Sequence, residues 1–183
     1  MKAKEIINLE KKLYFSGKKE WIKEWLSASN KYVIWSYVKN LRKEEQFREL
    51  ADQNKLYLCL LLYYRRRKNI LGRKLGFDIP GGVFGPGLLI WHSGSIAVNP
   101  FARVGKNAVI VGNLCIGNKS GKKTAPQIGD NCTFGWDTTV IGDIKLGDGC
   151  RIGAKALVNH SFEEENTVLV GVPAKNIANI GDR

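Results

Sequence analysis

A six-residue repeat runs through the second half of the chain and constrains its fold more than any other feature. A helix repeats about every 3.6 residues and a strand every 2, so neither alone produces a period of six. Short strands joined by tight turns do produce it, and coils of such strands stack into a parallel β-helix with a continuous apolar core. Aliphatic or aromatic residues keep the repeat, with one twelve-residue gap, at Val98, Val104, Ile110, Ile116, Ile128, Phe134, Val140, Leu146, Ile152 and Val158.

Two further positions of the repeat are recognisable. We expect positive φ at the glycines that directly follow the aliphatic position, which are Gly105, Gly117, Gly129, Gly135, Gly147 and Gly153. Four places after the aliphatic position stand small or apolar residues, which are Ala108, Leu114, Cys132, Thr138, Ile144, Cys150 and Ala156. Cys132 and Cys150 are separated by three repeats, which make one full turn of the coil. We therefore expect two reduced thiols stacked in the core, with a disulfide or a metal site as the alternative.

The sequence divides into three regions, which together predict a mainly β protein with a helical cap. Residues 1–76 have helical spacing and predict an α-helical N-terminal region of three or four helices, the last over Leu56 to Leu71 and ending at Gly72. Residues 77–175 form the β-helix domain, and residues 176–183 form a C-terminal tail. A two-residue phase shift near Ile96 predicts an irregular first coil, and the polar stretch 118–126 predicts a protruding loop.

The charge of the chain limits its partners. A net charge of +12 at pH 7 suggests a phosphate-bearing ligand or a membrane surface, while no nucleic-acid module is recognisable, so no nucleic-acid partner is expected. The segment Leu56–Lys74 could contact an anionic membrane, or its apolar face could pack against other helices. We expect no secretory leader, because the N-terminal residues are polar and charged, and no membrane-spanning segment, because no apolar run reaches the about 20 residues that one requires. We predict a cytoplasmic location, with the inner face of the membrane as a further place.

The candidate chemistry centres on one histidine. The chain has only His92 and His160, far apart in sequence, so we expect no metal site. Small residues follow His92, and we expect it to point outward from a flat strand, where it could accept a proton from a hydroxyl. Asp78, fourteen residues earlier and thus close to one coil away, is the natural partner to orient the ring. A structural role for both residues is the alternative.

Several motifs, in a fixed order, resemble the acyl-CoA-dependent hexapeptide acyltransferases, specifically the serine acetyltransferase group. They are the lead-in Asp78-Ile79-Pro80, the segment Trp91–Pro100 with His92, the turn Cys115–Asn118 with the lysine- and glycine-bearing loop after it, and the closing Gly171–Lys175. The resemblance implies a left-handed β-helix, a homotrimer, and acetyl-CoA held between neighbouring subunits. It makes His92 the general base of a direct acetyl transfer and Asp78 its orienting partner. The implied coenzyme A positions are Gly135, Trp136, Ala154, Lys155, Val172, Pro173 and Lys175.

The acceptor positions depart from the serine enzymes. That group carries an aspartate directly before the histidine and an arginine–histidine pair before a loop proline, whereas this chain has Trp91 and Thr124-Ala125. Loss of these charged groups lowers the affinity for a zwitterionic acceptor such as serine, since each charge-assisted hydrogen bond contributes about 1.5–3 kcal/mol. Trp91 suits the apolar face of a sugar ring, and Asn113 suits a sugar hydroxyl, with a solvated corner as the alternative for Asn113. The pattern resembles the family members associated with surface-polysaccharide O-acetylation. The sequence thus favours a sugar acceptor. Serine acetylation and a non-catalytic trimeric scaffold are the alternatives.

Overall fold

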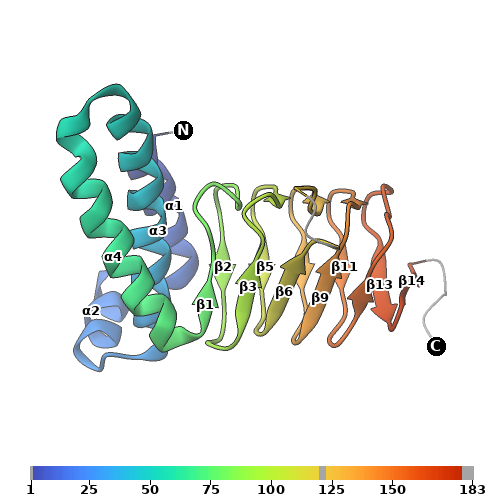
Figure 1. Cartoon of the computed structure of the whole chain (residues 1–183). Coiled ribbons are helices and arrows are strands. Elements are labelled where there is room, and N and C mark those ends of the chain that lie inside the picture. Colours follow the sequence, from blue (N-terminus) through green and yellow to red (C-terminus); the bar gives the residue numbers. More distant parts are fainter. Residues whose placement is uncertain (1, 120–122, 179–183) are drawn as a thin grey trace.

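A helical cap packs on one end of a three-sided β-helix in the computed structural model, which describes residues 2–119 and 123–178 (Figure 1). The helices lie beside the first coils, and β14 lies at the opposite end of the molecule. Residues 120–122 of the predicted loop and residues 179–183 of the predicted tail lie outside the described residues. The buried apolar side chains of cap and coils form one continuous core.

The cap differs from its prediction in where its helices begin and end. Residues Asn30–Gln53 form one long helix. The last helix does not end at Gly72, because the missing side chain there lets the helix approach the first strand: a Cβ atom would lie 2.5 Å from the Phe77 carbonyl oxygen. It ends at Leu75, followed by the left-handed Gly76. The elements are α1 (Ala3–Tyr14), α2 (Lys18–Leu26), α3 (Asn30–Gln53), the 3-10 helix η1 (Lys55–Tyr57) and α4 (Leu58–Leu75).

Three sheets of short parallel strands, visited in turn by the chain, form the sides of the β-helix. Their orders are β1-β3-β6-β9-β12, β10-β7-β4 and β14-β13-β11-β8-β5-β2, and within the described part of the chain only the β13–β14 pair is antiparallel. The strands are β1 (Phe77–Asp78), β2 (Leu89–Ile90), β3 (Ile96–Val98), β4 (Arg103–Val104), β5 (Val109–Ile110), β6 (Leu114–Gly117), β7 (Gln127–Ile128), β8 (Thr133–Phe134), β9 (Thr138–Ile141), β10 (Lys145–Leu146), β11 (Arg151–Ile152), β12 (Leu157–Val158), β13 (Val168–Gly171) and β14 (Ala174–Asn176).

The strand register explains both irregularities of the repeat. Where the repeat is regular, residues that pair on neighbouring coils are three repeats apart in sequence, as Ile96 and Leu114 are. Ile90 instead pairs with Ile110, two positions beyond that regular spacing. The two extra residues therefore lie between Ile90 and Ile96, and the predicted irregular first coil is confirmed. Val104 pairs with Ile128, a full repeat beyond the regular spacing, because the interruption at 118–126 lies between them.

The predicted inward positions are confirmed. All ten residues of the aliphatic repeat and all seven of the small positions are buried. Cys132 and Cys150 are free, and their thiols donate to the same Gly147 carbonyl oxygen at 3.4 and 3.0 Å, respectively. The pair of reduced core thiols is thus confirmed. Within the described ranges no cluster of His, Cys, Asp or Glu side chains forms a metal site.

The repeated glycines have a different role from the predicted one. Positive φ occurs two or three residues after the aliphatic position, at residues such as Asn107, Asp137 and Lys155, and not at the repeated glycines. Most of those glycines are required by close stacking instead. A Cβ atom on Gly135 would lie 2.6 Å from the backbone nitrogen of Ala154 on the next coil, inside van der Waals contact.

A buried ion pair joins the cap to the first coil. The Arg42 guanidinium lies 2.7 Å from the Glu10 carboxylate and donates to the backbone oxygens of Phe84 and Gly85 at 2.8 and 2.7 Å. The same carboxylate accepts backbone N–H groups of the coil. Nearby, the Tyr14 hydroxyl of α1 accepts the N–H of Ile90 at 2.8 Å, two residues before His92. The helical cap therefore fixes the strand that leads to the candidate base.

Candidate active site

His92 lies exposed in the bend between β2 and β3, and not on a flat strand as predicted. The bend contains the two extra residues of the first coil. Two contacts hold it, since the Gly94 N–H donates to the Leu75 oxygen at 3.0 Å and the Ser95 N–H donates to Asn113 Oδ1 at 2.8 Å. The imidazole makes no hydrogen bond to any described residue, so it is open to an incoming hydroxyl.

One row of corner residues continues from His92 along the β-helix. The aligned residues Ile90, Ile110, Phe134 and Ile152 pair in sequence across β2, β5, β8 and β11. Two residues after each of them lie His92, Gly112, Trp136 and Ala154, which we name the corner row. Backbone hydrogen bonds between neighbouring coils extend to the corner row, where the Lys155 N–H donates to the Trp136 oxygen at 2.8 Å. Positions far apart in sequence thus share one edge of the molecule.

Trp136 crosses a whole coil to reach His92. The two ring centroids lie 5.8 Å apart, although one coil separates the residues. The indole lies over Gly112, where a Cβ atom would be only 2.1 Å from its Cε3 atom. The missing side chain at Gly112 is therefore what lets Trp136 form a wall beside the candidate base.

Gly112→Ala is expected to displace the Trp136 ring from His92. In the parent chain the indole protons of Trp136, assigned with Trp136→Phe, should show nuclear Overhauser contacts to the His92 ring, and in Gly112→Ala these contacts should be lost. Gly117→Ala is the matched control, because a Cβ atom there would make only ordinary contacts of 3.6 and 3.8 Å. Undiminished contacts between the two rings in Gly112→Ala would contradict this account of the wall.

The other predicted coenzyme A positions lie on or beside the corner row. Gly135 precedes Trp136, and Lys155 follows Ala154 with a φ of 60°. Val172 and Pro173 form the turn between β13 and β14, where Val172 is exposed. Lys175 pairs with Val170 on the outermost strand of the same sheet. The structure therefore places all seven predicted positions along one edge, and their role in binding remains a prediction.

Asp78 and Asn113 are placed less simply. Asp78 is exposed on β1 opposite Ala97, on a different sheet from β2, and among the described residues it makes no hydrogen bond to His92. Its role in orienting the ring stays a prediction, since catalytic hydrogen bonds are often unformed without substrate. The Asn113 side-chain oxygen is occupied by the Ser95 N–H. That contact gives Asn113 a structural role at the bend, and contact with a sugar remains a prediction.

A cavity of about 390 Å³ opens beside His92, and the sequence did not predict it. Cap and coil build it together, because Leu13 and Tyr14 come from α1 and Lys31 from α3, whereas Leu89, Ile90, Trp91 and His92 come from the first coil. Spacing along the chain carries no signal for this contact, since cap and coil have different periods. The cavity has room for a small acceptor next to the imidazole.

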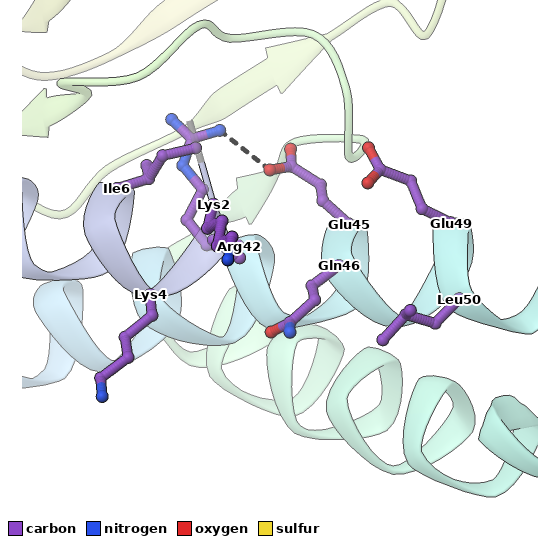
Figure 2. A pocket seen from close by; sticks show the side chains of 9 residues that line it. Lys2, Lys4, Ile6, Arg42, Glu45, Gln46, Glu49 and Leu50 are labelled. Atoms are coloured by element: carbon purple, nitrogen blue, oxygen red, sulfur yellow. Dashed lines mark hydrogen bonds and ion pairs between the residues drawn. The ribbon is translucent and has the colours of Figure 1, made fainter.

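A larger cavity of about 450 Å³ lies between α1 and α3 (Figure 2). Its charged side chains include Arg42 and Glu45, whose ion pair measures 3.0 Å. It is lined by Lys2, Ala3, Lys4, Ile6, Arg42, Glu45, Gln46, Glu49 and Leu50, with no histidine or cysteine. The cavity beside His92 is therefore the better candidate for acyl transfer. None of the helices in the described part of the chain is long and apolar enough to cross a membrane.

The chain is similar to serine acetyltransferases. It is 35% identical to one from Mycobacterium tuberculosis over 105 residues, 56% of this chain and 45% of that protein. It is 30% identical to one from Staphylococcus xylosus over 131 residues, 66% of this chain and 60% of that protein. The chain thus spans about half the length of these curated relatives. No protein-family model matches it.

Solved serine acetyltransferases have the same fold. The structure from Neisseria gonorrhoeae matches 96% of this chain and 66% of its own, with a TM-score of 0.69 and 23% identity. The soybean apoenzyme matches 79% of this chain and 57% of its own, with a TM-score of 0.62 and 26% identity. The left-handed β-helix that the sequence predicts is the fold of these neighbours. By sequence and by fold, the chain is similar to the serine acetyltransferases, a group of hexapeptide-repeat acyltransferases.

Proposed function

We propose that the chain is an acetyl-CoA-dependent O-acetyltransferase with His92 as general base. The observation that carries this proposal is the exposed imidazole at the head of the corner row, between a cavity for an acceptor and an edge for an extended cosubstrate. The similarity to serine acetyltransferases supports it, and one solved serine acetyltransferase of this fold is a complex with CoA. Acetyl-CoA is consumed in the reaction, and the proposal needs no metal.

The proposed reaction is a single direct transfer. His92 takes the proton of the acceptor hydroxyl while its oxygen attacks the thioester carbon, and the carbon–sulfur bond breaks as the new ester bond forms. The proton on the imidazolium then passes to the departing coenzyme A sulfur. No acyl-enzyme forms, and Asp78 steadies the histidine ring.

Coenzyme A would lie along the corner row. The small Ala154 leaves space beside the backbone, and the ammonium groups of Lys155 and Lys175 are suited to phosphate groups. Trp136 closes the end near His92. A homotrimer with each site between two subunits is part of the proposal, because a row on the exposed edge of one chain needs a neighbour to enclose it.

Serine is the first acceptor candidate, because the similar proteins are named for it and a soybean serine acetyltransferase of this fold is a complex with serine. These comparisons favour the sequence's alternative over its preferred sugar acceptor. A sugar hydroxyl of a surface polysaccharide or its precursor is the second candidate. It is favoured by one observation: the exposed Trp91 ring lines the His92 cavity where the serine enzymes carry an aspartate, and the buried Ala125 offers no charge.

Thiol release from acetyl-CoA tests the proposal. The chain is incubated with serine and, separately, with free and nucleotide-linked sugars. Release with serine at a substrate-like KM supports the serine candidate. Release with a sugar but not serine selects the second candidate. No release with any acceptor, together with no acetyl-CoA binding, would overturn both and identify a non-catalytic scaffold.

A further inference from the structure

One exposed face of the cap combines apolar and basic side chains without acidic ones. From residue 54 to residue 75 the chain has no aspartate or glutamate. We name as the α4 surface nine of the exposed side chains of η1 and α4, which are Leu56, Leu58, Leu62, Tyr63, Arg66, Arg67, Ile70, Arg73 and Lys74. Most of them recur every three or four residues, which places them on one side of the helix.

The opposite side of α4 accounts for the packing of this helix. Leu61, Lys68, Gly72 and Leu75 are buried, again at helical spacing, and the Lys68 ammonium lies 2.8 Å from the Glu44 carboxylate of α3. Burial alone would raise the pKa of Glu44, but hydrogen bonds from Lys68 and two arginines lower it below its ordinary value. The packing of α4 on the cap therefore does not use the α4 surface, where Leu56 and Leu62 remain 82% and 51% exposed.

The cations of the α4 surface lack acidic partners. Arg65 and Lys68 both pair with Glu44, on the inner side. Among the described residues, Arg66, Arg67, Arg73 and Lys74 form no ion pair, and Arg67 only donates to the Tyr63 hydroxyl at 3.0 Å. Four unpaired cations beside exposed leucines and a tyrosine make a face that fits a surface with negative headgroups over hydrocarbon.

We propose that the α4 surface docks on an anionic membrane surface. The turn from α3 through η1 into α4 lies at the end of the cap far from β14, so a flat bilayer can approach it without meeting the coils (Figure 1). The exposed leucines enter the interface and the cations contact lipid phosphates. A second copy of the chain is a poorer occupant, because pairing this face with itself would oppose its own cations.

Co-sedimentation of the full chain with vesicles tests this proposal. The chain should sediment with phosphatidylcholine vesicles that contain phosphatidylserine, and not with pure phosphatidylcholine, and added salt should weaken the binding. Each cation near such a surface is worth about fivefold in partitioning, so Arg66→Gln/Arg73→Gln should bind about 25-fold more weakly. Leu56→Gln/Leu62→Gln should also bind more weakly, by about tenfold or more.

Lys106→Gln/Lys145→Gln is the matched control, because both lysines are exposed on the coils and the charge change is the same. The control should bind like the parent, and circular dichroism should show that all variants are folded. Equal loss in the control, or no binding to anionic vesicles, would overturn the proposal. So would a change of oligomeric state in the α4 variants, because it would assign this face to a second copy. None of these measurements uses acetyl-CoA, so the proposed enzymatic function stands or fails separately.

Discussion

His92→Ala is expected to lower the rate of acceptor-dependent thiol release by about 10²–10⁴-fold, the usual contribution of a positioned general base. His92 is exposed and its ring makes no hydrogen bond to any described residue, so its removal should leave the fold and the acetyl-CoA affinity largely unchanged. The measurement is the turnover rate with saturating acetyl-CoA, together with the thermal unfolding midpoint.

His160→Ala is the matched control for this substitution. His160 is also exposed, and among the described residues its ring interacts with Asn159 and the Phe162 ring. It follows β12, which belongs to a different sheet from the strands that precede the corner row. Its replacement should leave the rate within a few-fold of the parent. An active His92→Ala variant, or an equal loss in His160→Ala, would remove His92 from the proposed mechanism.

Arg42→Met is expected to reduce the free energy of unfolding by about 3–5 kcal/mol, the cost of leaving one partner of a buried ion pair uncompensated. The substitution leaves the fully buried Glu10 carboxylate without the Arg42 cation, and it removes the donor to two carbonyl oxygens of the first coil. Burial disfavours the charged guanidinium, but Glu45 and Glu10 outweigh this effect and raise the pKa of Arg42. Urea unfolding followed by circular dichroism measures the loss.

Arg48→Met provides the comparison for the buried pair. Arg48 also pairs with a glutamate, Glu44, but its side chain is 41% exposed and that glutamate keeps two other cations. Removing so exposed a partner should cost about 1 kcal/mol or less. If Arg42→Met were no more destabilised than Arg48→Met, the buried pair would not be the joint between cap and coil.

The sequence predicted the core of the β-helix because one physical requirement repeats there. Every third of a coil must bury one side chain, so a missed or shifted position is visible as a break in the period. The phase shift near Ile96 and the interruption at 118–126 were both found in this way. The same counting, with both irregularities included, places Trp136 two coils after His92 and at the same corner. The contact between these two residues could therefore have been predicted from the sequence.

Other features depend on contacts that have no period. The repeated glycines were predicted to supply positive φ, whereas most of them leave room for the backbone of the next coil. The end of α4 was placed at Gly72, because a glycine that permits tight packing looks the same in sequence as one that ends a helix. The cavity beside His92 needs α1 to dock on the first coil, and that docking rests on the contact between Glu10 and Arg42, which belong to different helices.

The most direct test of the central claim is to titrate acetyl-CoA into the parent chain and into Ala154→Trp by calorimetry. Ala154 is exposed on the corner row, so a large ring there should block the proposed edge without entering the core. Lys106→Trp, exposed on a different corner, is the control. The account predicts binding to the parent and to Lys106→Trp, and at least about tenfold weaker binding to Ala154→Trp, the loss that a clash of about 1.4 kcal/mol would cause. Equal binding to all three chains, or no binding to the parent, would contradict it.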